Sequence, residues 1–369
     1  MMKPVEEYFV PWMHGQKMYV SPHIELAWRE PQLRRMMSNE NPHPPSEKVL
    51  AAINEYAKLA NRYADQGTAV RTKIAEINGL DGPGNVLLGN GSSEIYDMIW
   101  RSLIIPNQGD EIIQHTPCFG IYKLRCQVCG GKLVSVPMRY EGEQFLFDPE
   151  AVIAAITPKT KAIVIANPNN PTGNFMDPED FVRIAETGVP FIVDEAYVEF
   201  AGMEMSQIGL LKQYKNVFIT RTLSKAYGLA GLRFGYLLAN KEIIDRISAT
   251  LIPWNLSTIA MWAGLAAFED TDALAERVTF NNDQVEMIET ELGKIPGLVI
   301  FHSHGNYILF DAGPAGKKGE DVVAYAQEKG IILRPQPTMY GSDGFFRITI
   351  GTREENEKIV KIIREFFAQ

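Results

Sequence analysis

The sequence has few of the residues that would mark a disulfide-rich or metal-binding protein. It contains only three cysteines, Cys118, Cys126 and Cys129, which are too few for a disulfide framework in a chain of 369 residues. Cys126 and Cys129 lack the second cysteine pair of a zinc site, and His302 and His304 have no third ligand close by in the sequence. We therefore expect no structural metal and no metal in the functional site.

The chain also lacks long apolar runs and clusters of basic residues. No stretch approaches the length of a membrane span, and residues 1–15 show no basic region followed by an apolar segment of signal-peptide length. The net charge of −9 argues against nucleic acid or an anionic membrane as a partner. We expect a cytoplasmic protein without a membrane or nucleic-acid partner, whose length suits one large core and one smaller core.

What the chain does contain is a regular alternation of apolar runs and helical stretches. Strands are predicted at residues 86–88, 111–115, 132–136, 162–166, 191–194, 217–220 and 234–239. Helices are predicted from Ser46, which suits an N-cap, from 68 to 78 before Gly79 as a C-cap, and from 241 through 292. This alternation is typical of an α/β fold with a mainly parallel sheet covered by helices on both faces.

The remaining part of the chain reads differently. Short strands are predicted at 307–310, 331–334 and 345–350, and helices near 320–329 and from 354 onward. These elements indicate a smaller α+β unit at the C-terminus. Residues 1–38 show no sustained periodicity, so we interpret them as an arm rather than a domain.

One segment, residues 221–236, is suited to holding a covalent ligand. Lys225 follows a predicted strand and lies among hydroxyls and glycines that let a planar ring approach the backbone. Thr222, Ser224 and Arg233 are the donors that a phosphate group needs, since a guanidinium binds phosphate in a forked geometry. A solvated lysine in a glycine-containing loop is the alternative, and a Ser-Lys pair alone would favour it.

Two other predicted strands end in polar side chains that favour a ligand site. The strand at 162–166 runs into NPNNPTG (167–173), and the strand at 191–194 ends in Asp194. Ligands of open α/β sheets bind at the carboxyl ends of the strands. A carboxylate there is costly unless a positive group meets it, and a protonated pyridine nitrogen would serve.

A third site lies at the start of the sheet, where a strand meets a glycine turn and a helix. Gly91, Ser92 and Ser93 would present backbone N–H groups at a helix N-terminus, which binds anions readily. The third glycine of a dinucleotide fingerprint is missing, because Glu94 follows directly. A cofactor phosphate is therefore the expected occupant.

Taken together, four motifs resemble the fold-type I pyridoxal-phosphate aminotransferases, and among them the histidinol-phosphate aminotransferases most closely. They are NPNNPTG (167–173), DEAYVEF (194–200), RTLSK with GLAGLR (221–233) and FRITIGTR (346–353). The match runs from about residue 39 to the C-terminus. It implies an N-terminal arm (1–45) that joins a small domain (281–369), a large cofactor-binding domain (46–280), and a homodimer whose active sites are completed by the partner subunit.

The resemblance also implies roles toward pyridoxal 5′-phosphate. Lys225 would carry the cofactor and, once displaced by substrate, would act as the base that moves a proton. Asp194 would keep the pyridine nitrogen protonated, Tyr197 and Asn170 would hydrogen-bond the phenolic oxygen, and Phe119 would stack on the ring. The phosphate would be held by Gly91, Ser92, Ser93, Thr222, Ser224, Arg233 and the neighbouring subunit's copy of Tyr63. For Tyr63, a partly buried tyrosine between two helices is an equal alternative.

The resemblance says less about the substrates, an amino donor and a 2-oxo acid acceptor. Arg347 matches the arginine that this superfamily uses for carboxylates, and Arg334 would suit a phosphorylated donor. A surface charge at the end of a strand is the alternative for Arg334. Asn39 and Trp12 are the other candidates, and Trp12 stands where the family has Pro-Tyr, which makes an aromatic amino acid the alternative donor.

Three functions remain open at this point. The favoured one is amino transfer from histidinol phosphate to 2-oxoglutarate by a ping-pong mechanism. A decarboxylase of the same fold, similar to phosphothreonine decarboxylase, would use the same residues. A non-catalytic binding module is disfavoured, because binding alone would not require all five of Asn170, Asp194, Tyr197, Lys225 and Arg233.

Overall fold

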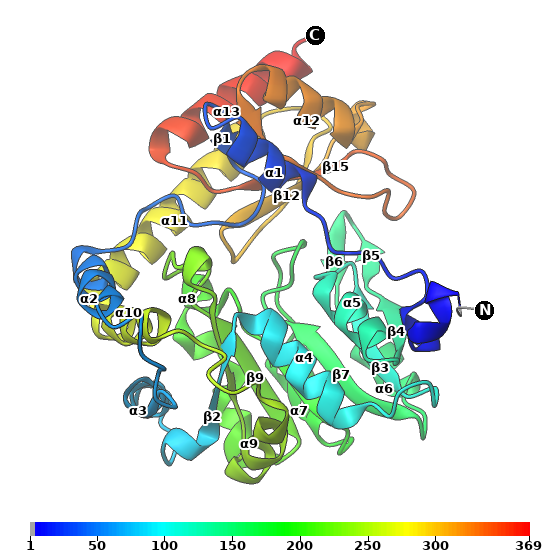
Figure 1. Cartoon of the computed structure of the whole chain (residues 1–369). Coiled ribbons are helices and arrows are strands. Elements are labelled where there is room, and N and C mark those ends of the chain that lie inside the picture. Colours follow the sequence, from blue (N-terminus) through cyan, green and yellow to red (C-terminus); the bar gives the residue numbers. More distant parts are fainter. Residues whose placement is uncertain (1–3) are drawn as a thin grey trace.

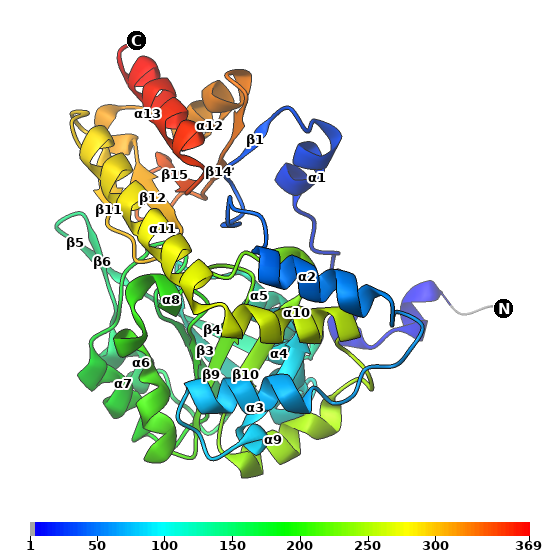
Figure 2. The same cartoon turned by 90° about the vertical axis from the view of Figure 1, so that its left-hand side faces the viewer.

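The computed structural model describes residues 4–369 as a larger and a smaller unit (Figure 1). One long helix, α11 (Thr271–Leu292), runs from the side of the larger unit into the smaller one (Figure 2). The boundary expected between residues 280 and 281 therefore falls inside a continuous helix. No helix among residues 4–369 is long and apolar enough to cross a membrane.

The larger unit is built on a seven-stranded sheet. In spatial order its strands are β2 (Val86–Asn90), β10 (Phe234–Leu238), β9 (Val217–Thr222), β8 (Phe191–Asp194), β7 (Thr160–Ala166), β3 (Glu111–Thr116) and β4 (Lys132–Pro137). All seven coincide with predicted strands. β10 runs antiparallel to both of its neighbours, and the other pairs are parallel. The mainly parallel sheet is thus confirmed, with one reversed strand.

Both faces of this sheet are covered by helices. Successive residues of a strand point to opposite faces, so neighbouring residues belong to two different apolar cores. Ile112 belongs to one core and Ile113 to the other, as do Ile192 and Val193. One face packs against α4 (Ser92–Leu103), α5 (Ile121–Val128) and α9 (Lys241–Ile247). The other packs against α2 (Glu47–Ala57), α3 (Thr68–Ile77), α6 (Pro149–Ala154), α7 (Pro178–Ala185) and α10 (Thr258–Glu269).

Local capping accounts for several of the helix ends. The Ser46 hydroxyl accepts a hydrogen bond from the Val49 N–H at 3.4 Å, so the predicted N-cap of α2 is confirmed. Gly79 adopts a φ of 61° just beyond α3, as its expected C-cap role requires.

The prediction of one continuous helical stretch from 241 through 292 was wrong. It is divided into α9, α10 and α11, with an irregular segment between α9 and α10. Pro253 in that segment has no N–H to donate, and the Ser257 hydroxyl then caps α10 by accepting from the Ala260 N–H at 3.1 Å. Both signals, the proline that interrupts a helix and the serine that caps the next one, were present in the sequence but lay inside an apolar run.

The smaller unit contains a four-stranded antiparallel sheet. Its strands, in spatial order, are β11 (Val299–Phe301), β12 (Tyr307–Asp311), β15 (Phe345–Thr349) and β14 (Arg334–Pro335). α11, α12 (Gly319–Glu328) and α13 (Arg353–Phe367) pack on it around a separate apolar core. α13 begins with a capping box in which Thr352 and Glu355 satisfy each other's backbone N–H groups.

The strand predicted at 331–334 is split between two sheets. β13 (Ile331–Ile332) pairs in parallel with β1 (Arg34–Arg35) of the N-terminal arm, and β14 pairs with β15. The arm also contains a helix that periodicity did not reveal, α1 (Pro22–Arg29), which lies beside the smaller unit (Figure 1). α1 is only eight residues long, too short to establish a helical pattern.

The remaining elements are short. β5 (Arg139–Glu141) and β6 (Gln144–Leu146) form a hairpin that projects from the larger unit toward the smaller one (Figure 1). α8 (Val198–Ala201) follows β8. Short stretches of 3-10 helix lie at Val5–Tyr8, Pro11–Met13, Pro83–Asn85, Met203–Met205, Gln207–Lys212, Ala230–Leu232, Ser248–Thr250 and Gly313–Ala315.

Candidate active site

The candidate site lies at the carboxyl ends of the central parallel strands. Asp194 is the last residue of β8, and Lys225 follows β9 by three residues. The parallel pairing of β8 with β9 brings these two ends together. Residues 38 and 39 of the arm and β15 of the smaller unit approach the same place.

Lys225 is the basic group at the centre of the site. Its Nζ lies 3.2 Å from the backbone oxygen of Asn39 and 5.5 Å from the centre of the Tyr197 ring. Burial and then the nearby charge of Arg347 lower the pKa of Lys225 to about 8. An amine with such a pKa is available as a nucleophile or base far more often than an ordinary lysine.

Asp194 is buried, with 4% of its surface exposed, and is held by hydrogen bonds. Tyr122 donates its hydroxyl proton to Oδ2 at 2.5 Å, and the Ala196 N–H donates to Oδ1 at 3.1 Å. Burial nevertheless raises the pKa of Asp194, while these hydrogen bonds act in the opposite direction. A cation placed against this carboxylate would therefore be strongly favoured.

An anion cradle lies at the start of α4. Gly91 is the N-cap with a φ of 76°, and the helix begins at Ser92 and continues through Ser93. A Cβ on Gly91 would overlap the guanidinium of Arg233, so the arginine lies directly against this turn. A Cβ on Gly235 of β10 would overlap the Ser92 nitrogen, so only glycine lets this strand approach.

Hydroxyl groups complete the cradle from the other side. The Oγ1 of Thr222, at the end of β9, lies 2.9 Å from the Oγ of Ser224, and both residues are buried. Helix N–H groups, two hydroxyls and a guanidinium in one place suit a phosphate monoester.

A chain of hydrogen bonds links the larger unit, the arm and the smaller unit. The Tyr197 hydroxyl accepts from Nδ2 of Asn39 at 2.9 Å and from Nδ2 of Asn170 at 3.3 Å. Arg347 donates to Oδ1 of Asn170 at 2.6 Å and to the Met37 oxygen at 3.0 Å. Burial raises the pKa of Tyr197 to about 12, so the hydroxyl keeps a proton that it can donate to a ligand.

Residues 33–363 match the aminotransferase class I and II family. The chain belongs to this family. It is 35% identical to the histidinol-phosphate aminotransferase of Methanosarcina mazei over 89% of this chain and 86% of that protein, and 36% identical to that of Methanococcoides burtonii over 89% and 88%.

Solved structures agree with this membership. The histidinol-phosphate aminotransferase of Sinorhizobium meliloti, solved in complex with pyridoxal-5′-phosphate, superposes with a TM-score of 0.86 at 26% identity, covering 97% of this chain and 98% of that one. The histidinol-phosphate aminotransferase of Clostridium acetobutylicum gives a TM-score of 0.82 at 26% identity over 91% and 99%. The fold-type I architecture expected from the motifs is confirmed.

The structure of this aminotransferase brings most of the predicted residues together. Phe119 lies in the loop before α5, where its ring packs edge-on against Tyr122 with centres 5.8 Å apart. Arg334 lies on β14 directly opposite Arg347 on β15, and both are at least partly buried. Like charges at opposed positions of neighbouring strands repel each other, so an anion placed against both arginines would relieve that repulsion.

Two predicted residues lie elsewhere within the aminotransferase chain. Trp12 lies in a 3-10 turn that packs beside α5 and lines a cavity with Asn107 and Gly130, which precede β3 and β4 and so lie at the amino ends of these strands. Within the single chain, Trp12 therefore does not share a cavity with Lys225. Tyr63 is 79% exposed and stacks on Trp254 with ring centres 4.4 Å apart, so within one chain it lies at the surface.

The arm instead reaches the arginine pair through the start of α1. His23 is partly buried, and burial followed by the charge of Arg334 lowers its pKa. Ala27, one turn further along α1, packs in a common apolar cluster with Ile332, two residues before Arg334. The sequence signal for this helix was Ser21 before Pro22, because proline is favoured at the first position of a helix.

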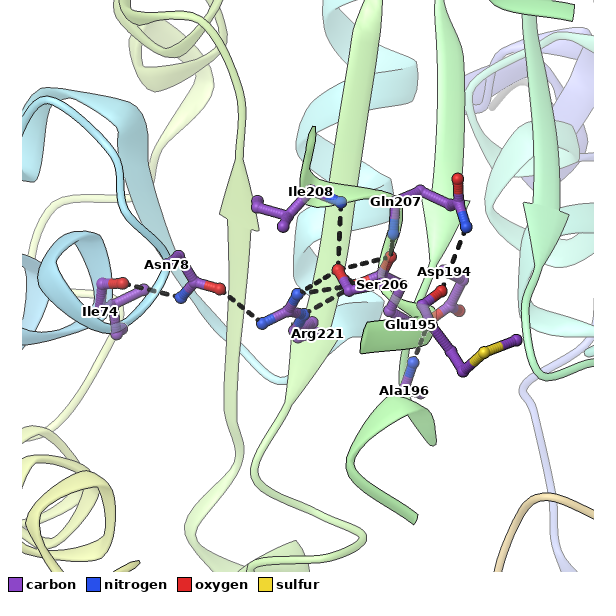
Figure 3. A network of polar contacts seen from close by, with 10 residues as sticks. Ile74, Asn78, Asp194, Glu195, Ala196, Ser206, Gln207, Ile208 and Arg221 are labelled. Carbon is purple, nitrogen blue, oxygen red and sulfur yellow. Dashed lines mark hydrogen bonds and ion pairs between the residues drawn. The ribbon is translucent and has the colours of Figure 1, made fainter. Parts of the chain in front are cut away.

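A polar network beneath the site fixes the orientation of β9 (Figure 3). Arg221 donates to the Glu195 carboxylate at 2.9 Å, to the Ser206 hydroxyl at 2.7 Å and to Asn78 Oδ1 at 2.7 Å. Glu195 also accepts from the Gln207 N–H at 2.6 Å. The pair is almost entirely buried, and such a pair is stable only when its partners satisfy it fully.

Two tyrosines of the site were missed from the sequence. Tyr122 lies on α5 and bonds Asp194, and Tyr307 of β12 donates to the Asn169 oxygen at 2.5 Å. Neither belongs to one of the four motifs. Their roles depend on which helix covers β8 and which strand faces the loop after β7, and local sequence does not encode either.

Proposed function

We propose that this aminotransferase uses pyridoxal 5′-phosphate to transfer the amino group of histidinol phosphate to 2-oxoglutarate. The observation that carries the substrate proposal is the cross-strand pair of Arg334 and Arg347, because the charge of Arg347 also acts on the buried amine of Lys225. Relatives at 35% and 36% identity over most of the chain are histidinol-phosphate aminotransferases, which supports this choice.

The residues present fit the cofactor. The absence of a Cβ on Gly91 leaves room for the guanidinium of Arg233, which together with Ser92, Thr222 and Ser224 supplies the donors that a phosphate needs. Asp194 is a buried carboxylate whose raised pKa favours a cationic ring nitrogen as its partner. Phe119 lies before α5, where its ring can cover one face of a planar ligand.

When bound, pyridoxal phosphate supplies an electron sink that stabilises negative charge on the α-carbon of the donor. Lys225 is the residue that would hold the cofactor and, when substrate is bound, would move the proton of the donor's α-carbon, for which a pKa of about 8 is well placed. Tyr197 and Asn170 would hydrogen-bond the phenolic oxygen. Asp194 would face the ring nitrogen and favour its protonated form.

The arginine pair selects the substrate. Arg347 is buried and its Nε has no hydrogen-bond partner among the described residues, which leaves a donor free for a substrate anion. Arg334 is less buried and carries no short ion pair among the contacts of residues 4–369. We assign the donor phosphate to Arg334 and the acceptor carboxylate to Arg347.

A comparison of donors tests the proposal. We expect histidinol phosphate to exceed histidinol, phenylalanine and tyrosine in kcat/KM, and Arg334→Ala to cost the phosphorylated donor about 2 kcal/mol, or ~30-fold, because one partner of a charged contact is removed. Arg364→Ala is the control, since Arg364 lies on α13 and pairs with Glu291 at the surface. Equal rates for phosphorylated and plain donors would favour an aromatic aminotransferase, and carbon dioxide release without a keto acid would favour a decarboxylase.

We also propose a homodimer in the cytoplasm, with a large domain of residues 46–280 and a small domain of 281–369 joined by the arm of 1–45. The dimer is supported by the exposed stacked pair Tyr63 and Trp254, because monomeric surfaces rarely present large aromatic side chains together. In the dimer Tyr63 would reach the partner's phosphate cradle. Free thiols at all three cysteines are consistent with a reducing compartment.

A further inference from the structure

The loop between β14 and β15, residues 336–344, is anchored firmly to the smaller unit at its base. The Ser342 hydroxyl donates to the Asp311 carboxylate at 2.6 Å, and the Ala312 N–H donates to the Gly344 oxygen at 3.0 Å. The loop then closes on itself, since the Met339 and Ser342 backbones exchange hydrogen bonds at 3.0 and 2.9 Å. Its tip is therefore held in a defined position relative to β14 and β15.

The tip crosses to the larger unit through Tyr340. The Tyr340 hydroxyl donates to the Met138 oxygen at 2.5 Å and lies 3.4 Å from the Thr116 oxygen. Its ring packs against Tyr140 and Phe145 of the β5–β6 hairpin, with ring centres 5.3 and 5.4 Å apart. Tyr340 has a φ of 49°, a conformation that a tyrosine keeps only where its surroundings impose it.

This contact joins the loop after β14 to the loop after β3, whereas Arg347 of β15 bonds Asn170 of the loop after β7. β14 is an edge strand of two residues, so Arg334 is held by pairing on one side only. Thr116 ends β3 and begins the loop that carries Phe119. The opposite side of the smaller unit is fixed separately, by Tyr307 on Asn169.

We propose that Tyr340 is a positioning residue that fixes Arg334 at its working distance from the cofactor-binding loops. The proposal deepens, and rests on, the assignment of Arg334 to the anionic end of the donor. Tyr340 itself contacts backbone oxygens and aromatic rings only, so it acts through Arg334. Its hydroxyl bond sets the spacing between the anion site and Lys225, on which productive alignment depends.

The test is Tyr340→Phe, which removes the bridging hydroxyl and keeps the ring packing. We expect kcat/KM for histidinol phosphate to fall about fivefold, mainly through KM, with histidinol changed less than about twofold. A purely structural role would lower thermal stability and affect both donors equally. Tyr325→Phe is the matched control, because Tyr325 lies on α12 and its hydroxyl contacts only Gln369 among the described residues.

A double-mutant cycle with Arg334→Ala decides whether Tyr340 acts through Arg334. We expect Tyr340→Phe to cause no further loss, within about twofold, once Arg334 is absent. Losses that multiply, or equal losses for both donors, would overturn the proposal. If the wild type does not prefer the phosphorylated donor, the substrate assignment fails, and the cycle is then measured with whichever substrate Arg334→Ala slows most. If Arg334→Ala slows none of them, Tyr340 has nothing to position and the proposal fails too.

Discussion

The lowered pKa of Lys225 predicts a particular pH dependence for attachment of the cofactor to the apoprotein. Only the unprotonated amine can attack an aldehyde. With a pKa of about 8 in place of the ordinary 10.5, about one Lys225 in eleven is unprotonated at pH 7, against about one in three thousand for an ordinary lysine. The site should therefore react about 300-fold faster at neutral pH than its amine would in water.

The assay is the change in absorbance when apoprotein and pyridoxal phosphate are mixed over pH 6 to 10. Dividing each rate by that of N-acetyl-lysine methylamide under the same conditions cancels ionisations of the cofactor itself. This ratio should stay constant up to about pH 8 and then fall about tenfold per pH unit, because Lys225 is by then mostly unprotonated while the model amine is not. A ratio that stays constant up to pH 10 would refute the lowered pKa.

A pair of variants tests the physical cause. Burial is the largest contribution to the low pKa, and the charge of Arg347 is the next. Arg347→Met should therefore raise the pKa of Lys225, move the midpoint of the profile to higher pH and slow attachment at pH 7. Arg334→Met removes a cation that is not among the neighbours shifting Lys225, so its midpoint should stay where it is. Identical midpoints for the two variants would show that burial alone sets the value.

Two further predictions concern the buried charges beneath the site. Burial raises the pKa of Glu199 from 4.5 to about 7. The protonated carboxyl therefore contributes stability that is fully present below about pH 4.5 and is lost as the pH rises through 7, by up to about 3 kcal/mol. Glu199→Gln should flatten the fall in Tm between pH 5 and 8, and an unchanged slope would contradict this. Arg221→Met leaves Glu195 buried without its cation and should cost about 3–5 kcal/mol in urea unfolding, whereas adding Glu195→Gln should recover most of the loss. Additive losses in the double variant would show that the pair is not coupled.

The larger unit could be predicted from the sequence because its strands are buried on both faces. A run such as Ile163, Val164 and Ile165 is apolar at every position, which identifies a parallel strand covered by helices on both sides. The break in the run from 241 to 292 had local signals in Pro253 and Ser257, but the split at Leu333 had none. The split depends on which partner strand pairs with a short apolar segment, and that is decided by tertiary contacts.

The residues of the candidate site also fall into those with a local sequence signal and those without one. Lys225, Asp194 and Gly91 could be placed because each lies at a strand end or within three residues of one, and the topology of a parallel sheet gathers those ends. The pairing of Arg334 with Arg347 could be expected only as a possibility, since it depends on the register of a two-residue strand. Tyr122 and Tyr307 act across elements and left no local signal.

The N-terminal arm shows how a misplaced residue changes the chemistry expected at the substrate. With Trp12 at the site, the donor end would meet an indole and a large apolar surface, which favours an aromatic amino acid. His23 of α1 instead lies near Arg334, and burial together with the charge of Arg334 lowers the pKa of its imidazole, so His23 is neutral near pH 7. A neutral imidazole can accept or donate one hydrogen bond but adds no charge, so the charge at the proposed donor site comes from Arg334 and Arg347. Under the substrate assignment proposed above, this charge favours an anionic donor end over an aromatic ring, and removal of Arg334 therefore tests the choice between the two substrates.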